Sequence, residues 1–376
     1  MSTIYLAQDK RPQPRHDPIL SEWFPSYAEK GISEAAAAKA IASLETWAKQ
    51  RFNAAVTMQE TPTGFGMQLL HFTLPRDTQG QPYRYFGVPE HIARLCHAHS
   101  WQHRIETFNQ GTGFQYDARI AYLSHARRVP VYLADSFVED EKDQPLLACP
   151  GWYFAEVTVP AKWQHIGIVP SLQYTSNSKG RVYPNQPGIK FDAWLNDHEI
   201  RLLQNNFWNF RIRKRVLFAD NSIPGTDPLR HWRDNLATAL AGIEALPDYA
   251  TNQHWQLMRS GMRSMALNVI GQFHHNGLGK QGQEQITGNS RTGFACKPGG
   301  PTLTDFTARW YHPEWSGAIW ARARARATNI ALSIPYNQLL KIYGDAVICK
   351  NPIPLIQDTG KVGAYRLKGA ANAQKD

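Results

Sequence analysis

Two short apolar segments, far apart in the sequence, each run into a single aspartate. Residues 114–116 precede Asp117, and residues 339–349 form two apolar halves on either side of Gly344 and Asp345. Apolar runs of this length are typical of β-strands, and a Gly-Asp pair between two of them predicts a tight hairpin. Both carboxylates are therefore expected at the rim of a sheet, where a metal ion can reach them. Taken singly, a helix-capping role for Asp117 and a turn role for Asp345 are the more common outcomes.

The composition is that of a folded protein with a basic surface. The 376 residues are 42% hydrophobic and 11% aromatic, and the formal net charge is +10. A basic surface attracts polyanions, with nucleic acid first and anionic membrane second. The chain has no run of 18 apolar residues and no signal-peptide pattern at its N-terminus, so we expect a soluble, cytoplasmic protein. Its four cysteines stand singly, which predicts reduced thiols and no zinc site.

Three regions are predicted along the chain. Residues 1–30 are rich in proline and charge, which favours an extended N-terminal arm. Residues 31–110 predict a small N-terminal α/β accessory domain, in which a helix starting after Ser33 is followed by a strand-rich stretch at 53–90 and a second helix. Residues 111–376 hold the remaining elements.

The elements expected after Asp117 alternate between strands and helices. Residues 118–128 have helical spacing, which puts Asp117 at a strand-to-helix junction, where N–H groups and the helix dipole can hold phosphate oxygens. Residues 152–159 alternate between apolar and polar side chains and predict a strand. A helix at 196–210 and a basic strand at 211–218 are expected next.

The longest helical pattern spans residues 251–273 and carries two arginines on its polar side. Arg259 and Arg263 are four residues apart, so both guanidinium groups project from the same face of the helix. In that position they could hold a triphosphate. For two arginines alone, a solvated basic face is the more common outcome.

The region between this helix and the C-terminal hairpin contains a loop-like stretch and a basic helix. Residues 274–308 are rich in Gly, Gln, Asn and Ser, so they predict an insertion. A helix is expected from Pro313 to about residue 330, with three arginines at every second position. Because a helix turns by about 100° per residue, only Arg322 and Arg326 share a face.

Taken in order, three of these motifs resemble the palm and fingers motifs of family B DNA polymerases. The first is Asp117 with Tyr122 five residues later, the second is the basic helix that ends in residues 266–273, and the third is residues 343–347. Their separations suit the short, protein-primed branch of that family. The resemblance implies an α+β fold with an antiparallel palm sheet, helices packed on it, and helical fingers.

The resemblance also implies a catalytic metal site. Asp117 resembles the first-motif aspartate and Asp345 the third-motif aspartate, which in the family hold two Mg²⁺ ions. Mn²⁺ is the alternative ion. One ion would lower the pKa of the primer 3′-hydroxyl, and the other would neutralise the triphosphate and the leaving pyrophosphate.

The remaining site residues follow from the same resemblance. Tyr122 resembles the aromatic residue that stacks under the incoming sugar and excludes a 2′-hydroxyl. Arg263, with Arg259 as its substitute, stands in for the lysine of the fingers that contacts the triphosphate. The sequence additionally implies nucleotide contacts at Asn268 and Gly271, and nucleic-acid contacts at Arg322, Arg326 and Lys341.

The sequence departs from the family pattern at several positions. In the third motif Tyr343 takes the place of the usual first acid, which leaves Asp345 alone. In the first motif Ile120 and Ala121 replace the usual Ser-Leu. An exonuclease Asp-x-Glu pair is not found in residues 1–110, and the stretch after Asp345 is too short for an ordinary thumb.

These observations predict a template-directed DNA polymerase that uses Mg²⁺, primer-template DNA and deoxynucleotides. A priming or processivity protein is a further expected partner, because the chain lacks a recognisable thumb. Two alternatives stay open. The first is a catalytically degenerate, polymerase-like subunit that binds nucleic acid. The second is a nucleotidyltransferase that adds nucleotides without a template or to a priming protein.

Overall fold

The computed structural model describes most of the chain. It covers residues 18–25, 27–81, 85, 88, 92–93, 95–96, 105–131, 138–140, 150–165, 186–218, 227–273, 311–354, 356, 359, 361 and 363–373. The insertion expected at 274–308, and most of the second helix expected in the N-terminal domain, lie outside these residues. None of the described helices is long and apolar enough to cross a membrane.

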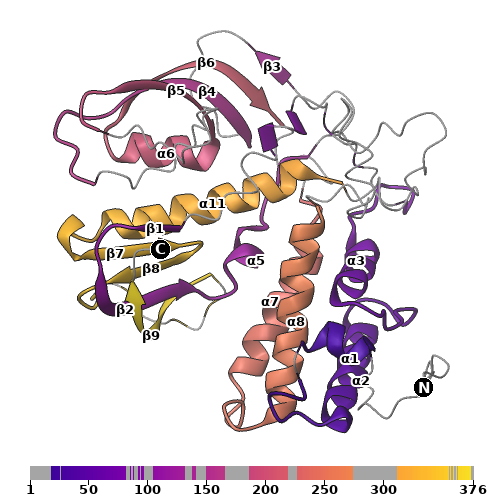
Figure 1. Ribbon diagram of the computed structural model, residues 1–376. Helices are drawn as coiled ribbons and strands as arrows, with labels where there is room; N and C mark the ends of the chain where they lie inside the picture. The colour runs from indigo at the N-terminus through magenta and orange to yellow at the C-terminus, as the bar shows by residue number, and fades with distance from the viewer. Residues whose placement is uncertain are drawn as a thin grey trace, which may run out of the picture.

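Two antiparallel sheets and a helical body make up the described structure, so the predicted α+β class is confirmed. The long helix α11 (Pro313–Leu332) runs between the two sheets, as Figure 1 shows. Helices α7 (Arg230–Glu244) and α8 (Gln253–Gln272) stand beside it, at a steep angle to α11. Helix α11 contacts both sheets and α8, and is therefore the element that joins the three parts.

The five-stranded sheet contains both aspartates of the predicted site. Its strand order is β1-β7-β8-β2-β9, and every neighbouring pair is antiparallel. The strands are β1 (Ile105–Thr107), β2 (Gly111–Ala118), β7 (Leu339–Tyr343), β8 (Ala346–Cys349) and β9 (Tyr365–Ala373), with a 3-10 turn at Tyr336–Gln338 before β7. The hairpin expected around Gly344 and Asp345 is confirmed as β7 and β8. Ala327 and Ala331 of α11 pack on one face of this sheet.

The four-stranded sheet forms a separate layer on the other side of α11. Its order is β3-β6-β4-β5. The elements are β3 (Val138–Asp140), β4 (Gly151–Thr158), β5 (Lys190–Asn196), α6 (Asp197–Asn205) and β6 (Asn209–Leu217). Strand β4 confirms the alternation seen at 152–159, whose apolar side chains pack against α6. Helix α6 ends earlier than expected, at Asn205, because Phe207 adopts a left-handed conformation with φ of 61°.

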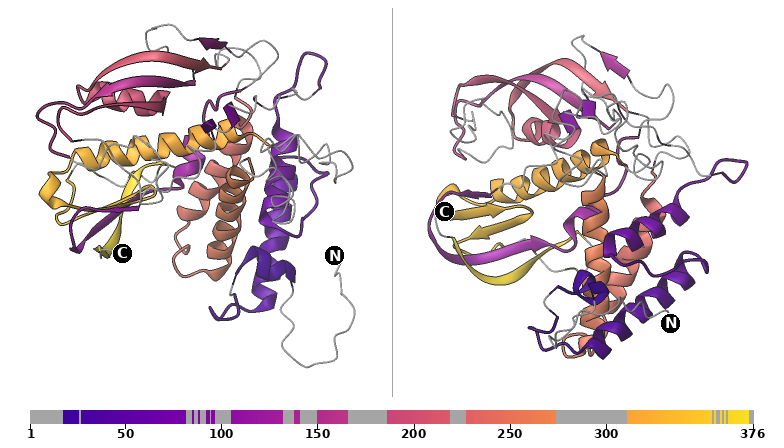
Figure 2. Two further views of the ribbon diagram at one scale, coloured as in Figure 1. Left: turned by 45° about the horizontal axis from the view of Figure 1, so that its top comes forward. Right: turned by 45° about the vertical axis from the view of Figure 1, so that its right-hand side comes forward.

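The helical body combines the N-terminal region with α7 and α8. Its N-terminal helices are α1 (Pro18–Trp23), α2 (Glu34–Arg51) and α3 (Pro62–Thr73). They share one apolar core with α7 and α8, and Figure 2 shows the N-terminal helices beside the α7 and α8 pair in both views. The apolar face predicted for residues 251–273 lies in this core. Among the described residues, the helices of the expected N-terminal α/β domain do not form a separate unit, because they pack into the core of α7 and α8.

The described residues differ from two further expectations for the N-terminal region, and residues 1–17 of the expected arm lie outside them. Part of the expected strand-rich stretch at 53–90 forms α3, because Pro62 occupies its first turn and the Thr61 hydroxyl accepts the Gly64 N–H at 3.0 Å. In place of an extended arm, residues 18–23 form α1. Trp23 is fully buried in the shared core, and burial of an indole outweighs the extended preference of a proline-rich sequence.

The helix expected at 118–128 is much shorter than predicted. Helix α5 covers only Ala121–His125, because Ile120 has a φ of 48°. A β-branched residue in the left-handed region is strained and breaks the helical path. A five-residue helix has little dipole, so the phosphate-holding helix start expected beside Asp117 is not formed.

Candidate active site

The strand register of the five-stranded sheet brings the two aspartates together. Strand β2 pairs with β8 so that Tyr116 faces Val347. Continuing that antiparallel register by two residues puts Ala118 opposite Asp345, and Asp117 is next to Ala118. Two acids separated by more than half of the chain thus lie at the same end of adjacent strands.

The electrostatic surroundings of Asp345 show how close the two acids are. The pKa of Asp345 is raised, first by burial of its carboxyl group and then by the negative charge of Asp117. The backbone N–H groups of Asp345 and Ala118 and the positive charge of Arg263 act in the opposite direction. A pair of like charges that share a site is a common feature of acid pairs that bind metal or protons.

Two basic side chains of β9 lie against Asp117. Arg366 Nε is 3.4 Å from Asp117 Oδ1, and Lys368 Nζ is 3.5 Å from Asp117 Oδ2. The β2 and β9 register shifts at this point, since Gln115 pairs with Gly369 while Tyr116 pairs with Leu367. This bulge is of the kind that redirects side chains beside functional sites. The sequence reasoning missed Arg366 and Lys368, although their alternate spacing in a C-terminal strand was a usable signal.

Two tyrosines flank the acid pair. Tyr122 lies in α5, and its ring packs on Trp320 of α11 with centroids 4.2 Å apart. Tyr365 donates a hydrogen bond from its hydroxyl to the Asp345 backbone carbonyl at 2.8 Å. Burial raises the pKa of both phenols, and the charge of Asp345 raises it further. Both phenols are therefore neutral donors beside the carboxylates, and Tyr365 was not predicted from the sequence.

The two arginines of α8 have different surroundings. Arg259 Nε is 2.5 Å from Glu244 Oε1, and the same carboxylate binds Arg119. Arg263 is exposed and makes no ion pair within the part of the chain that the structure describes. Its positive charge lowers the pKa of both Tyr122 and Asp345. Among the described residues, Arg263 is thus the α8 cation whose charge acts at the acid pair, while Arg259 is engaged in an ion pair with Glu244.

The other nucleotide-contact candidates lie further along α8. Asn268 is exposed, and Gly271 is in the last turn of the helix. At about 100° per residue, Asn268 is rotated by about 140° from Arg263, so the two side chains do not share a face. Their expected nucleotide contacts therefore stay predictions.

The nucleic-acid candidates outside α8 have three different environments. Arg322 is 7% exposed, and its guanidinium group donates hydrogen bonds to the backbone carbonyls of His125, Arg127 and Arg128. Arg322 is therefore not placed for the expected nucleic-acid contact, because it is buried and both of its terminal nitrogens donate hydrogen bonds inside the protein. Arg326 is exposed, with its guanidinium carbon 5.5 Å from the centre of the Tyr365 ring. Lys341 is partly buried in β7, within the same sheet.

Arg324, which lies between Arg322 and Arg326 on α11, forms an ion pair with the layer of the four-stranded sheet. Its Nη2 atom is 3.1 Å from Glu199 Oε1, and both side chains are almost completely buried. The other carboxylate oxygen of Glu199 accepts the Asn196 N–H at 3.0 Å, which caps α6. The arginine-rich stretch of α11 thus serves internal packing at two positions.

The side chains at the acid pair fit a magnesium ion in part. Magnesium prefers oxygen ligands and is commonly held by one or two carboxylates together with substrate phosphates. Asp117 and Asp345 supply two such carboxylates. No cluster of three or more histidine, cysteine or acidic residues occurs among the described residues. Two carboxylates alone leave most positions of an octahedral magnesium shell to other ligands.

The five-stranded antiparallel sheet has Asp117 near the end of β2 and Asp345 in the adjacent β7–β8 turn, and with the helices beside it forms a polymerase-like fold. Solved structures of Phi29 DNA polymerase have this fold. Its complex with primer-template DNA and incoming nucleotides superimposes with a TM-score of 0.57 at 14% identity, over 85% of this chain and 54% of that chain. Its orthorhombic crystal form gives a TM-score of 0.56 at 14% identity, over 83% and 53%.

The comparison extends to a complex of Phi29 DNA polymerase with single-stranded DNA, which has a TM-score of 0.54 at 13% identity and covers 85% of this chain and 54% of that chain. At these identities the similarity concerns the fold. The chain spans about half of the length of the polymerase that it matches. No family model and no curated protein matches the sequence.

Proposed function

We propose that the protein is a template-directed DNA polymerase that transfers deoxynucleotides to a primer 3′-hydroxyl. The observation that carries this proposal is the meeting of Asp117 and Asp345 at one end of the five-stranded sheet, with Arg263 of α8 acting on the same carboxylate. The polymerase-like fold supports it, and so does the net charge of +10, which favours binding to a polyanion.

Each side chain of the site has a role in this proposal. Asp117 and Asp345 would hold Mg²⁺, or alternatively Mn²⁺, which when bound supplies charge stabilisation to phosphoryl transfer. Arg263 would contact the triphosphate and stabilise the charge that leaves with pyrophosphate. Tyr122, fixed against Trp320, would stack under the sugar and exclude a 2′-hydroxyl. Primer-template DNA, deoxynucleotides and a priming or processivity protein are the proposed partners.

Primer extension with the two carboxylates changed tests the proposal. Asp117→Asn and Asp345→Asn should each lower nucleotide incorporation by at least about 100-fold, because a neutral amide lacks the negative charge with which a carboxylate binds a divalent cation. Asp192→Asn is the matched control, since Asp192 is an exposed strand aspartate in the other sheet. Full extension by the Asp117→Asn/Asp345→Asn double variant would refute the mechanism.

A catalytically degenerate nucleic-acid-binding subunit is the second candidate, and the surroundings of Asp117 favour it. Arg366 and Lys368 already supply positive charge beside this carboxylate, and the described residues hold two acids there instead of a larger cluster. Salt-dependent DNA binding without incorporation in Mg²⁺ or Mn²⁺ would select this candidate. Incorporation that does not depend on a template would select a terminal or protein-priming nucleotidyltransferase.

A further inference from the structure

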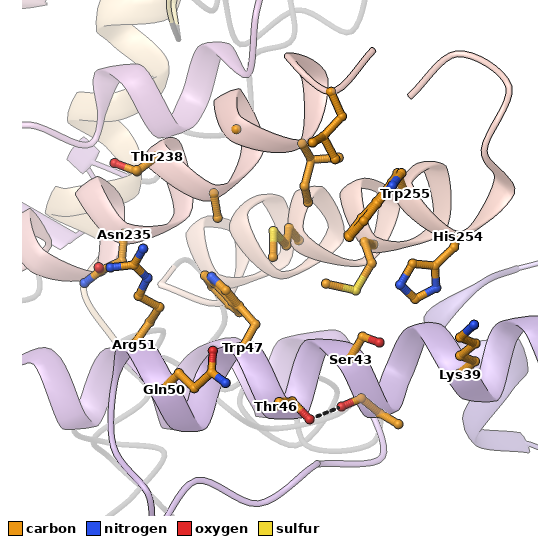
Figure 3. Close-up of a pocket in the computed structure, with 17 residues that line it drawn as sticks. Lys39, Ser43, Thr46, Trp47, Gln50, Arg51, Asn235, Thr238, His254 and Trp255 are labelled. Atoms are coloured by element: carbon orange, nitrogen blue, oxygen red, sulfur yellow. Dashed lines mark hydrogen bonds between the residues drawn. The ribbon is translucent and has the colours of Figure 1, made fainter. Parts of the chain in front are cut away.

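A groove lies on the helical body between α2 and α7, with α8 as its floor. Its volume is about 690 Å³. Helices α2 and α7 both pack on α8, and in Figure 3 the labelled residues of α2 face those of α7 and α8 across the groove. The groove lies toward the end of the α7 and α8 pair that points away from both sheets (Figure 1). It is therefore separate from the acid pair.

The lining of the groove is mostly apolar and includes small residues that leave room. Trp47, Trp255 and Met258 contribute large side chains, whereas Gly242 and Ala239 of α7 are small. A Cβ atom added to Gly242 would meet no other atom within 4 Å, so the space above it is open. Flexible methionines beside aromatic rings are typical of grooves that accept the apolar face of a helix.

The charged residues that line the groove are both positive. Lys39 and Arg51 of α2 are exposed, contribute to the lining, and form no ion pair among the described residues. His254 also lines the groove, where burial and the nearby charge of Lys39 lower its pKa, so it is neutral near pH 7. No aspartate or glutamate contributes to the lining. The groove thus complements an apolar segment with acidic residues near its ends.

The dimensions favour a helical occupant. Lys39 and Arg51 are twelve residues apart on α2, which corresponds to about 18 Å at 1.5 Å per residue. An amphipathic helix of about three turns has this length. It would lie beside α2 and α7 and complete the packing around α8. A nucleic-acid strand fits less well, because such grooves need a longer run of cations along the backbone path.

We infer that this groove is the docking site for an acidic amphipathic helix of a partner protein. The helix would insert an apolar stripe between Trp47 and Trp255, over Met258, and pair acidic residues with Lys39 and Arg51. The inference does not depend on polymerase activity, because the groove shares no side chain with the acid pair.

Binding of labelled peptides to the full chain tests the inference. The probe is a 16-residue amphipathic helical peptide with leucines at i, i+3, i+4 and i+7 and glutamates near both ends. A second peptide carries lysine in place of each glutamate, and a 12-nucleotide oligothymidine is the nucleic-acid probe. Measured by fluorescence anisotropy, the acidic peptide should bind about tenfold more tightly than the lysine peptide. A tenfold difference in Kd corresponds to about 1.4 kcal/mol, which is the combined contribution expected from two exposed ion pairs.

Variants within the groove make the assay specific. Gly242→Leu should weaken binding of the acidic peptide by at least about tenfold, because its side chain fills the open space. Ala241→Leu is the matched control, since Ala241 is the neighbouring residue of α7 and does not line the groove. The Lys39→Glu/Arg51→Glu double variant, which changes exposed residues only, should reverse the preference in favour of the lysine peptide.

Hydrogen exchange then locates the peptide. The acidic peptide should slow amide exchange in residues 39–51 of α2 and residues 235–244 of α7. Three outcomes would overturn the inference: no binding of the acidic peptide, binding that is insensitive to Gly242→Leu, or a Gly242→Leu-sensitive site for oligothymidine. Self-association of the chain that is lost in Gly242→Leu would also overturn it, by assigning the groove to a second copy.

Discussion

Asp117 and Asp345 differ in what surrounds them, and the difference defines what each can do. Asp117 lies between two cations of β9, Arg366 and Lys368, whereas Asp345 accepts backbone N–H groups and is partly buried. The two cations partly balance the negative charge of Asp117. The negative charge of Asp345 has a free-energy cost, because burial raises the pKa of its carboxyl group and favours the protonated form. A divalent cation shared by both carboxylates would relieve that cost.

Tyr122 is the residue on which sugar selectivity is expected to depend. Its ring is held against Trp320, so it cannot move aside easily for a 2′-hydroxyl. Tyr122→Ala should raise the relative incorporation of ribonucleotides by at least about tenfold, measured as the ratio of kcat/KM values for the two sugars. Tyr336→Ala, which removes a tyrosine from the 3-10 turn before β7, should leave that ratio unchanged. An unaltered ratio in Tyr122→Ala would remove the role assigned to this ring.

His125 predicts an acid-sensitive element of stability. Burial, followed by the nearby charges of Arg326, Arg322 and His198, lowers the pKa of His125 from 6.5 to about 3. The folded state therefore holds this histidine neutral, whereas the unfolded chain protonates it below about pH 6.5. The contribution of neutral His125 to the free energy of unfolding is therefore complete above pH 6.5 and is lost as the pH falls from 6.5 toward 3.

The test compares unfolding of the wild type with that of His125→Gln between pH 7 and pH 4. The wild type should lose about 1–2 kcal/mol more stability than the variant on going from pH 7 to pH 5, because glutamine does not titrate. His231→Gln, at an exposed position of α7, serves as the control and should follow the wild type. Parallel pH profiles for the wild type and His125→Gln would contradict the expectation.

At the level of elements, α11 depends on buried charges to hold the two sheet layers together. Arg324 and Glu199 pair between α11 and α6, almost without contact with solvent. Removing one member of a buried pair leaves the other charge uncompensated. Arg322 has a similar internal role toward the segment after α5, where it binds three backbone carbonyls.

Arg324→Met should therefore lower the free energy of unfolding by about 3–5 kcal/mol, measured by urea denaturation. The double variant Arg324→Met/Glu199→Gln should recover much of this loss, because it removes both buried charges. If the double variant were as unstable as the single one, the loss would come from packing and not from the unpaired Glu199 carboxylate.

For the whole molecule, the main finding is that the N-terminal helices and the α7 and α8 pair form one body. Gly66 of α3 lies so close to α8 that an added Cβ atom would be 2.6 Å from Val269 Cγ2 and 3.3 Å from the Met265 carbonyl oxygen. Such an approach requires glycine. Movement of α8 toward or away from the acid pair would therefore carry α3 with it.

Gly66→Ala should destabilise the protein by about 1–3 kcal/mol, because the new methyl group overpacks the contact between α3 and α8. Gly242→Ala, at the open position on α7, is the matched control and should stabilise the protein by about 0.5–1 kcal/mol through helix propensity. Urea denaturation measures both changes. A neutral effect of Gly66→Ala would mean that α3 and α8 are not tightly packed.

Local sequence patterns predicted many of the elements. The alternation at 152–159, the heptad-like spacing of α8 and the Gly344-Asp345 turn each depend on neighbours a few residues away, so they could be recognised without the fold. The same kind of reasoning failed for α3, whose apolar residues fit both the helical and the strand period. It also failed for α5, which is shortened by the strained backbone of Ile120, a conformation that residue propensities do not predict.

The sequence alone determined that Asp117 and Asp345 end strands, because that property is local. The tertiary structure decided which groups surround them. The pairing of β2 with β8 brings the two acids together, and that of β2 with β9 adds Arg366 and Lys368. It also decided that Arg259 pairs with Glu244, while the charge of Arg263 acts on Asp345. These contacts join residues far apart in the chain, and strand register and helix packing, rather than residue spacing, fix their distances.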